Sequence, residues 1–166
     1  SVMQLSHPMS VDLYCEKMVK PARLIIVRLL GGVSYWQYGV EQISEICASN
    51  GSALAFLPGD DQPDEGLTAR SNLPSESCHR LWQYLVHGGS ENAREFLNFA
   101  SSILDGSEQW REPRPLLRAG LYWPGIDSVD LAARANNWIA DAPVAAIVFY
   151  RAHLQSGNLK PILQLI

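Results

Sequence analysis

Apolar and polar positions along the chain form blocks whose spacing predicts strands and helices in turn. Residues 23–30 (RLIIVRLL) are a nearly continuous apolar run, rich in β-branched side chains and followed by Gly31-Gly32. Such a run is typical of a strand buried on both faces of a parallel sheet. Three further runs have the same character, so we expect four strands in all, the others lying at 53–57, 117–122 and 143–150.

Helical periodicity fills the intervals between these runs. Apolar residues recur every three or four positions over 10–19, 38–49 and 128–139, and a last helix is expected to start near Asn158. Two further helices follow one another directly, one from Ser75 to Gly88 and one from Ser90 to Gly106. Their serine starts and glycine stops predict a helical hairpin.

The order of these elements predicts the fold class. Strands that alternate with helices indicate an α/β fold with an open, doubly wound, mostly parallel sheet of about four strands, flanking helices and an inserted helical hairpin. We expect a single α/β domain over 1–166, with its sheet core in 20–57 and 117–166 and a loop plus hairpin in 58–116. The apolar end LKPILQLI carries no helix stop signal, so we expect the chain to be truncated there.

Composition and charge exclude several classes. The chain is 47% hydrophobic with a net charge of −4, which argues against disorder. Its 13 basic and 17 acidic residues form no basic cluster, which argues against nucleic acid and anionic membranes as partners. There is no secretory signal and no long apolar span. The three scattered cysteines indicate buried free thiols and hence a cytoplasmic protein.

The common catalytic motifs are missing from the sequence. The first strand is followed by GGVSYW where a dinucleotide-binding loop would have GxGxxG, and no GxxxxGK[ST] phosphate loop occurs. The sequence also lacks the GxSxG turn of α/β-hydrolases and the HExxH zinc motif. The four histidines are scattered. No reaction can be assigned from a short motif, and the catalytic residues stay unassigned.

The loops after the strands are the best candidates for a binding site, because α/β folds bind ligands at the carboxyl ends of their strands. Arg151 could clamp a carboxylate, and His153 could move a proton or ligate a metal. The alternative is structural: glycines turn the chain, Arg151 caps carbonyls and His153 is a satisfied structural residue. The candidate substrate-binding residues are Gly31, Gly32, Tyr35, Trp36, Asp60, Trp123, Arg151, His153, Gln155 and Asn158.

Four longer stretches resemble one known family. They are LLGGVSYWQYGVEQI (29–43), LAFLPGDDQPD (54–64), RAGLYWPG (118–125) and APVAAIVFYRAHLQSGN (142–158). Together they resemble the large subunit of aerobic cobaltochelatase, the CobN family, which is similar to the large porphyrin-binding subunit of magnesium chelatase. The resemblance runs from about Met9 to Ile166, with the segments in the same order.

The resemblance implies a function for the whole complex. Family members insert Co²⁺ into hydrogenobyrinic acid a,c-diamide during cobalamin biosynthesis, as ligases that form nitrogen–metal bonds. The large subunit binds the tetrapyrrole, while two smaller subunits, one an AAA+ ATPase, hydrolyse ATP. Members are several-fold longer, and the match lies near their N-terminus. The chain is thus expected to be an N-terminal portion, inactive alone. The alternative is a non-catalytic scaffold domain that contacts other parts of the same polypeptide.

Overall fold

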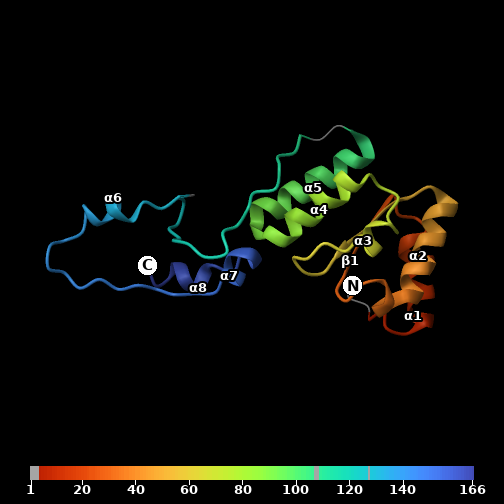
Figure 1. The fold of residues 1–166 in the computed structure, drawn as a ribbon, viewed down its shortest axis with the longest axis horizontal. Coiled ribbons are helices and arrows are strands. Elements are labelled where there is room, and N and C mark those ends of the chain that lie inside the picture. Colours follow the sequence, from red (N-terminus) through yellow and green to blue (C-terminus); the bar gives the residue numbers. More distant parts are fainter. Residues whose placement is uncertain (1–3, 107–108, 127) are drawn as a thin grey trace.

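The computed structural model describes residues 4–106, 109–126 and 128–166, which form a packed body and an extended arm (Figure 1). The body contains α1 (Pro8–Tyr14), β1 (Leu24–Leu29), α2 (Gln37–Asn50), β2 (Ala53–Pro58), α3 (Glu65–Thr68), α4 (Ser75–His87) and α5 (Gly89–Asp105). A π-helical turn (Cys15–Val19) follows α1, and a 3-10 turn (Val33–Trp36) precedes α2. The arm contains α6 (Leu131–Ala135), α7 (Arg151–Ser156) and α8 (Lys160–Leu163).

The two strands pair in parallel, from Leu24 opposite Ala53 to Leu29 opposite Pro58. Alternate side chains of β2 point to opposite faces of the sheet, as in any strand. Leu54 and Phe56 pack with α1 and α2, whereas Ala55 and Leu57 pack with α4 and α5. The sheet is therefore a shared wall between two apolar cores, which explains why β2 has no polar face.

Side chains rather than a third strand satisfy the outer edge of β2. The backbone N–H of Leu54 donates to Asn72 Oδ1 at 2.7 Å, and that of Phe56 donates to Ser71 Oγ at 2.8 Å. Asn72 Nδ2 in turn donates to the carbonyl of Ser52 at 2.9 Å. Because these backbone groups already have partners, no further strand can pair with this edge of β2 without displacing residues 71–72.

Two of the four predicted strands are confirmed, and the other two segments are not strands here. Residues 117–122 and 143–150 lie in the arm, where the described residues contain one isolated antiparallel bridge, Trp123 to Ile126. A strand needs a hydrogen-bonded neighbour, and neither segment has one. The α/β class with a parallel sheet holds, but the doubly wound sheet of about four strands does not form within the described residues.

The helices follow the predicted pattern more closely. The hairpin is confirmed as α4 and α5, and the predicted helix 38–49 is confirmed as α2. Helix α6 is shorter than the predicted 128–139. It starts later, because Asp130 caps it by accepting from the N–H of Ala133 at 3.1 Å, and it ends at Ala135. Residues 151–156, predicted as loop, form α7. All three cysteines are buried and free, as the sequence predicts.

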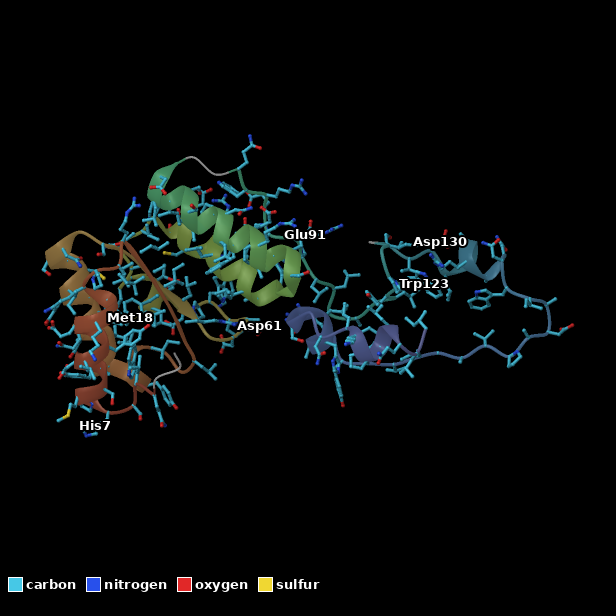
Figure 2. The ribbon with its side chains drawn as sticks, turned by 180° about the vertical axis from the view of Figure 1, so that it is seen from behind. His7, Met18, Asp61, Glu91, Trp123 and Asp130 are labelled. Atoms are coloured by element: carbon cyan, nitrogen blue, oxygen red, sulfur yellow. The ribbon has the colours of Figure 1, made fainter. Side chains whose placement is uncertain are left out.

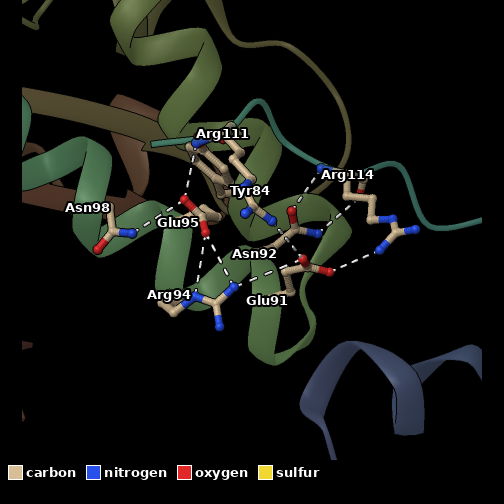
Figure 3. Close-up of polar contacts among 8 residues, drawn as sticks. All are labelled: Tyr84, Glu91, Asn92, Arg94, Glu95, Asn98, Arg111 and Arg114. Atoms are coloured by element: carbon tan, nitrogen blue, oxygen red, sulfur yellow. Dashed lines mark hydrogen bonds and ion pairs between the residues drawn. The ribbon is translucent and has the colours of Figure 1, made fainter. Parts of the chain in front are cut away.

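A cluster of polar side chains fastens residues 111–114 to the hairpin (Figure 3). Asn92 donates to the carbonyl of Arg114 at 2.9 Å and accepts from its N–H at 2.8 Å. Glu95, only 5% exposed, accepts from the N–H of Arg111 at 3.1 Å, and the hydroxyl of Tyr84 donates to the Arg111 carbonyl. This hairpin clamp directs the chain from the body into the arm.

Through the Glu95 carboxylate, the clamp makes the stability of the fold depend on pH in the acid range. Burial raises the pKa of the Glu95 carboxyl, but hydrogen bonds from the Arg111 backbone, Asn98 and Arg94 outweigh it and lower the pKa below its usual 4.5. The charged carboxylate therefore stabilises the fold above about pH 4.5, and this contribution is lost as the pH falls through the lowered pKa.

We expect Glu95→Gln to lower the unfolding midpoint in urea at pH 7 and to flatten the decline in stability between pH 5 and pH 3. Glu91→Gln is the matched control, because Glu91 is half-exposed and pairs with Arg114 at the surface. Equal acid profiles for the Glu95 variant and the unmodified chain would show that the carboxylate does not carry this effect.

Candidate functional site

A cavity of about 650 Å³ lies beside the carboxyl end of β2. Its floor and walls are mainly apolar, formed by Leu57, Pro58, Pro63, Ala69 and Trp82. Polar side chains complete the lining, namely Asp64, Glu65, Thr68, Ser75, Glu76, Cys78 and His79. This is the end of a parallel sheet at which α/β proteins bind ligands.

Helices α3 and α4 build the cavity, and both are fixed by specific contacts. Asp64 caps α3 by accepting from the N–H of Leu67 at 3.0 Å, and Leu67 itself is fully buried. Trp82 of α4 donates through Nε1 to the carbonyl of Asp60 at 3.0 Å. The His79 ring packs on Trp82 with the ring centres 5.5 Å apart. The walls are therefore held from both the loop and the helix.

The cavity is acidic. Three of its lining residues carry carboxylates (Asp64, Glu65 and Glu76), and none is a lysine or arginine. Arg80 offsets part of this charge from outside the lining, since it pairs with Glu76 at 3.0 Å. Burial raises the pKa of the Cys78 thiol, so this side chain contributes as a neutral thiol. The lining favours an uncharged or cationic group over an anion.

Five of the predicted binding residues lie near the carboxyl edge of the sheet, and they differ in exposure and in their contacts. Gly31 and Gly32 turn the chain after β1 with φ of 94° and 75°, conformations that favour glycine. Tyr35 is 77% exposed and packs its ring beside Gly31. Trp36 instead points inward and donates to the carbonyl of Leu5 at 2.7 Å. Asp60 accepts from the N–H of Gln62 at 3.1 Å.

The other five predicted residues lie in the arm, where most make structural contacts. Figure 2 shows Trp123 in the arm, away from Asp61 at the sheet edge. The Arg134 guanidinium lies 4.1 Å from the Trp123 ring centre. Arg151 donates to the carbonyl of Leu116 at 3.2 Å and Gln155 to that of Val86 at 2.8 Å. His153 packs against Phe149, and Asn158 is exposed.

The structure therefore does not bring the ten predicted residues into one site. Among the described residues, an ion pair joins the two regions, since the Arg118 guanidinium of the arm lies 3.8 Å from Asp61. Within the described residues, no group of three or more His, Cys, Asp or Glu side chains could hold a metal ion, and no helix is long and apolar enough to cross a membrane. Asp127, in the loop after the third predicted strand (117–122), lies outside the described residues.

Sequence reasoning missed the α3 and α4 side of the cavity. The acidic stretch Asp60 to Glu65 reads as a solvated loop, and Trp82 reads as core. A usable signal was present, because Asp64 before Glu65-Gly66-Leu67 is a typical helix start. The side chain of Trp82 does pack with the second core, yet one face of it borders the cavity.

Comparison with known proteins gives consistent results. Residues 82–166 match the CobN/Magnesium Chelatase family. The chain is 46% identical over 157 residues to the aerobic cobaltochelatase subunit CobN of Pseudomonas aeruginosa and 40% identical over 174 residues to that of a Sinorhizobium species. The catalytic subunit of cobaltochelatase from Mycobacterium tuberculosis superposes with a TM-score of 0.68 at 25% identity, over 93% of the chain.

The matches cover nearly all of this chain but little of its relatives. The aligned regions take up 94% and 100% of this chain, and 12% and 14% of the two curated relatives. The solved structure is likewise matched over 12% of its own length. The chain thus spans about an eighth of the length of the proteins that it resembles.

Proposed function

The chain belongs to the CobN/magnesium chelatase family, and from this premise we propose that it forms an N-terminal portion of the large subunit of an aerobic cobaltochelatase. The observation that carries the proposal is 46% identity over 94% of the chain to a subunit of that name. The structural match to a cobaltochelatase catalytic subunit supports it independently.

For the complete enzyme, the proposal specifies a reaction and its partners. Co²⁺ and hydrogenobyrinic acid a,c-diamide are the substrates, and the enzyme is a ligase that forms nitrogen–metal bonds in the cytoplasm. Two smaller subunits, one an AAA+ ATPase, supply ATP hydrolysis. The sequence lacks a phosphate-binding loop motif, which is consistent with ATP hydrolysis by the smaller subunits.

The geometry supports a role for the carboxyl edge in holding the macrocycle. Tyr35 offers an exposed aromatic face in the turn after β1, and the cavity at the end of β2, which Tyr35 does not line, has apolar walls. Both features suit the flat face of a tetrapyrrole. The acid side chains of the substrate would be repelled by Asp64 and Glu65, so we place them outside the cavity. Arg118, whose side chain is 89% exposed, lies close enough to this edge to pair with one of them.

The arm residues receive narrower roles. Arg151 and Gln155 position α7 against the hairpin, since both donate to backbone carbonyls there or next to it. His153 is the arm residue best suited to take a pyrrole proton, because none of the described residues hydrogen-bonds its ring. Removal of the two pyrrole protons is required before a metal can enter the ring.

Titration of the chain with hydrogenobyrinic acid a,c-diamide tests this role. We expect tryptophan fluorescence to be quenched, and Tyr35→Ala to weaken binding roughly 2- to 10-fold, the equivalent of about 0.5–1.5 kcal/mol for one aromatic contact. Tyr150→Ala is the control, because Tyr150 is equally exposed but lies in the arm.

The same titration distinguishes macrocycle binding from the alternative, a non-catalytic scaffold domain. That alternative draws support from Trp36, Arg151 and Gln155, whose polar groups donate to this chain's own backbone. A scaffold domain would show no quenching even at high micromolar ligand, whereas equal affinity of the two tyrosine variants would remove Tyr35 from the proposed site.

A further inference from the structure

Residues 143–150 (PVAAIVFY) form an apolar, extended segment that nothing in the described chain pairs or covers. Among the described residues, no backbone group between Pro143 and Phe149 takes part in a hydrogen bond. Val148 is 94% exposed and the adjacent Ile147 is 41% exposed, and adjacent side chains of an extended segment face opposite ways. Both faces and both edges of the segment are therefore open.

Strand β2 shows what such a sequence does when partners are present. Its residues ALAFLP are as apolar as 143–150, and it is buried on both faces and bonded along both edges. An exposed run of this kind, with free N–H and C=O groups, is a template for pairing with a sheet edge. The small sheet of this chain cannot accept it beside β2, because Ser71 and Asn72 occupy that edge.

The structure presents the segment at a defined place. Its end is held on the hairpin side by the contacts of Arg151 and Gln155, and the Phe149 ring packs edge-on against Tyr122 at 5.7 Å. Its start follows Asp141, a turn residue with φ of 63°. The segment therefore starts at a tight turn, runs without a hydrogen-bonded partner, and ends at α7, which Arg151 and Gln155 hold in place (Figure 1).

Resting on the proposed function, we propose that residues 143–150 are a strand that pairs with a sheet edge supplied by another part of the cobaltochelatase large subunit. The curated relatives are about eight times as long as the region matched, so most of the large subunit lies outside this chain. The family match, residues 82–166, includes the segment.

A second copy of this chain is a poorer occupant. Two such segments would pair as a two-stranded ribbon and leave both apolar faces in water, and isolated ribbons of that kind are marginally stable. A multi-stranded sheet with helices on its faces would cover what is exposed here, as the two cores cover β2.

Hydrogen–deuterium exchange compares the 166-residue chain with the complete large subunit. We expect the amides of 144–149 to exchange at the rate of an unstructured peptide in the chain, and to be protected roughly 100-fold or more in the large subunit. Rapid exchange in both would overturn the proposal. Protection in the chain alone, lost on dilution, would also overturn it and indicate a second copy. Exchange does not require cobalt insertion, so this result is independent of whether the enzyme is active.

Two variants, each with one added carboxylate, test whether residues 143–150 pair with a sheet in the large subunit. Val148→Asp is expected to leave the melting temperature of the chain unchanged, because Val148 is already in water, and to remove the protection of 144–149 in the large subunit. Asn137→Asp places the same charge at an exposed polar position before the turn and should preserve protection. Unchanged protection in the Val148 variant would contradict the proposal.

Discussion

Replacing Gly39 by alanine is expected to destabilise the chain by about 1–3 kcal/mol, although alanine is the better residue in most helices. A Cβ at position 39 would lie 2.2 Å from two carbons of the Trp36 indole. The indole cannot turn away cheaply, because its Nε1 is hydrogen-bonded to the Leu5 carbonyl and it packs against the first core. The steric cost therefore exceeds the gain in helix propensity.

Ser44→Ala in the same helix is the matched comparison. The buried hydroxyl of Ser44 has no hydrogen-bond partner among the described residues, so its removal eliminates an unsatisfied polar group. We expect this variant to gain about 0.5–1 kcal/mol, including the better helix propensity of alanine. Urea denaturation of both variants at pH 7 measures the difference, and a Gly39 variant as stable as the Ser44 variant would contradict the packing described around Trp36.

The sequence pattern predicted the strands whose partners lie within the described chain. The apolar runs at 23–30 and 53–57 pair with one another and are covered by helices of this chain, so their pattern and their structure agree. The run at 143–150 has the same pattern but no partner in the described residues. An apolar pattern indicates that a segment is suited to burial in a sheet. It does not indicate whether the strands and helices that would bury the segment are part of the same chain.

The sequence predicted the edge of the sheet at which the candidate cavity lies, but not the residues that line the cavity. The glycine turn after β1 marks the carboxyl edge, and Tyr35 is exposed beside it. Tryptophans were the least predictable residues, because an indole serves equally in a core or on a rim. Trp36, a predicted binding residue, is anchored inward, whereas Trp138, which falls on the apolar face of the helix predicted at 128–139, is 46% exposed.

Cobalt insertion is expected to require this region within the large subunit and to be absent from the 166 residues alone. Insertion needs a macrocycle that is held and distorted, two pyrrole protons removed and a metal freed of its water ligands. The described residues offer a rim and one candidate base, His153, while the family members that this chain matches are about eight times as long. We therefore expect the chain to act only together with the remaining large subunit and the smaller subunits proposed above.

The central claim, that this chain is a working portion of a cobaltochelatase large subunit, is tested most directly by reconstitution. Co²⁺ insertion into hydrogenobyrinic acid a,c-diamide is followed by absorbance with ATP and both small subunits, using the complete large subunit, the same subunit lacking these 166 residues, and that deletion with the chain added back. We predict full activity, background activity and partial recovery, in that order, and no insertion by the chain alone. An undiminished rate in the deletion, or insertion by the chain without the rest of the enzyme, would contradict the claim.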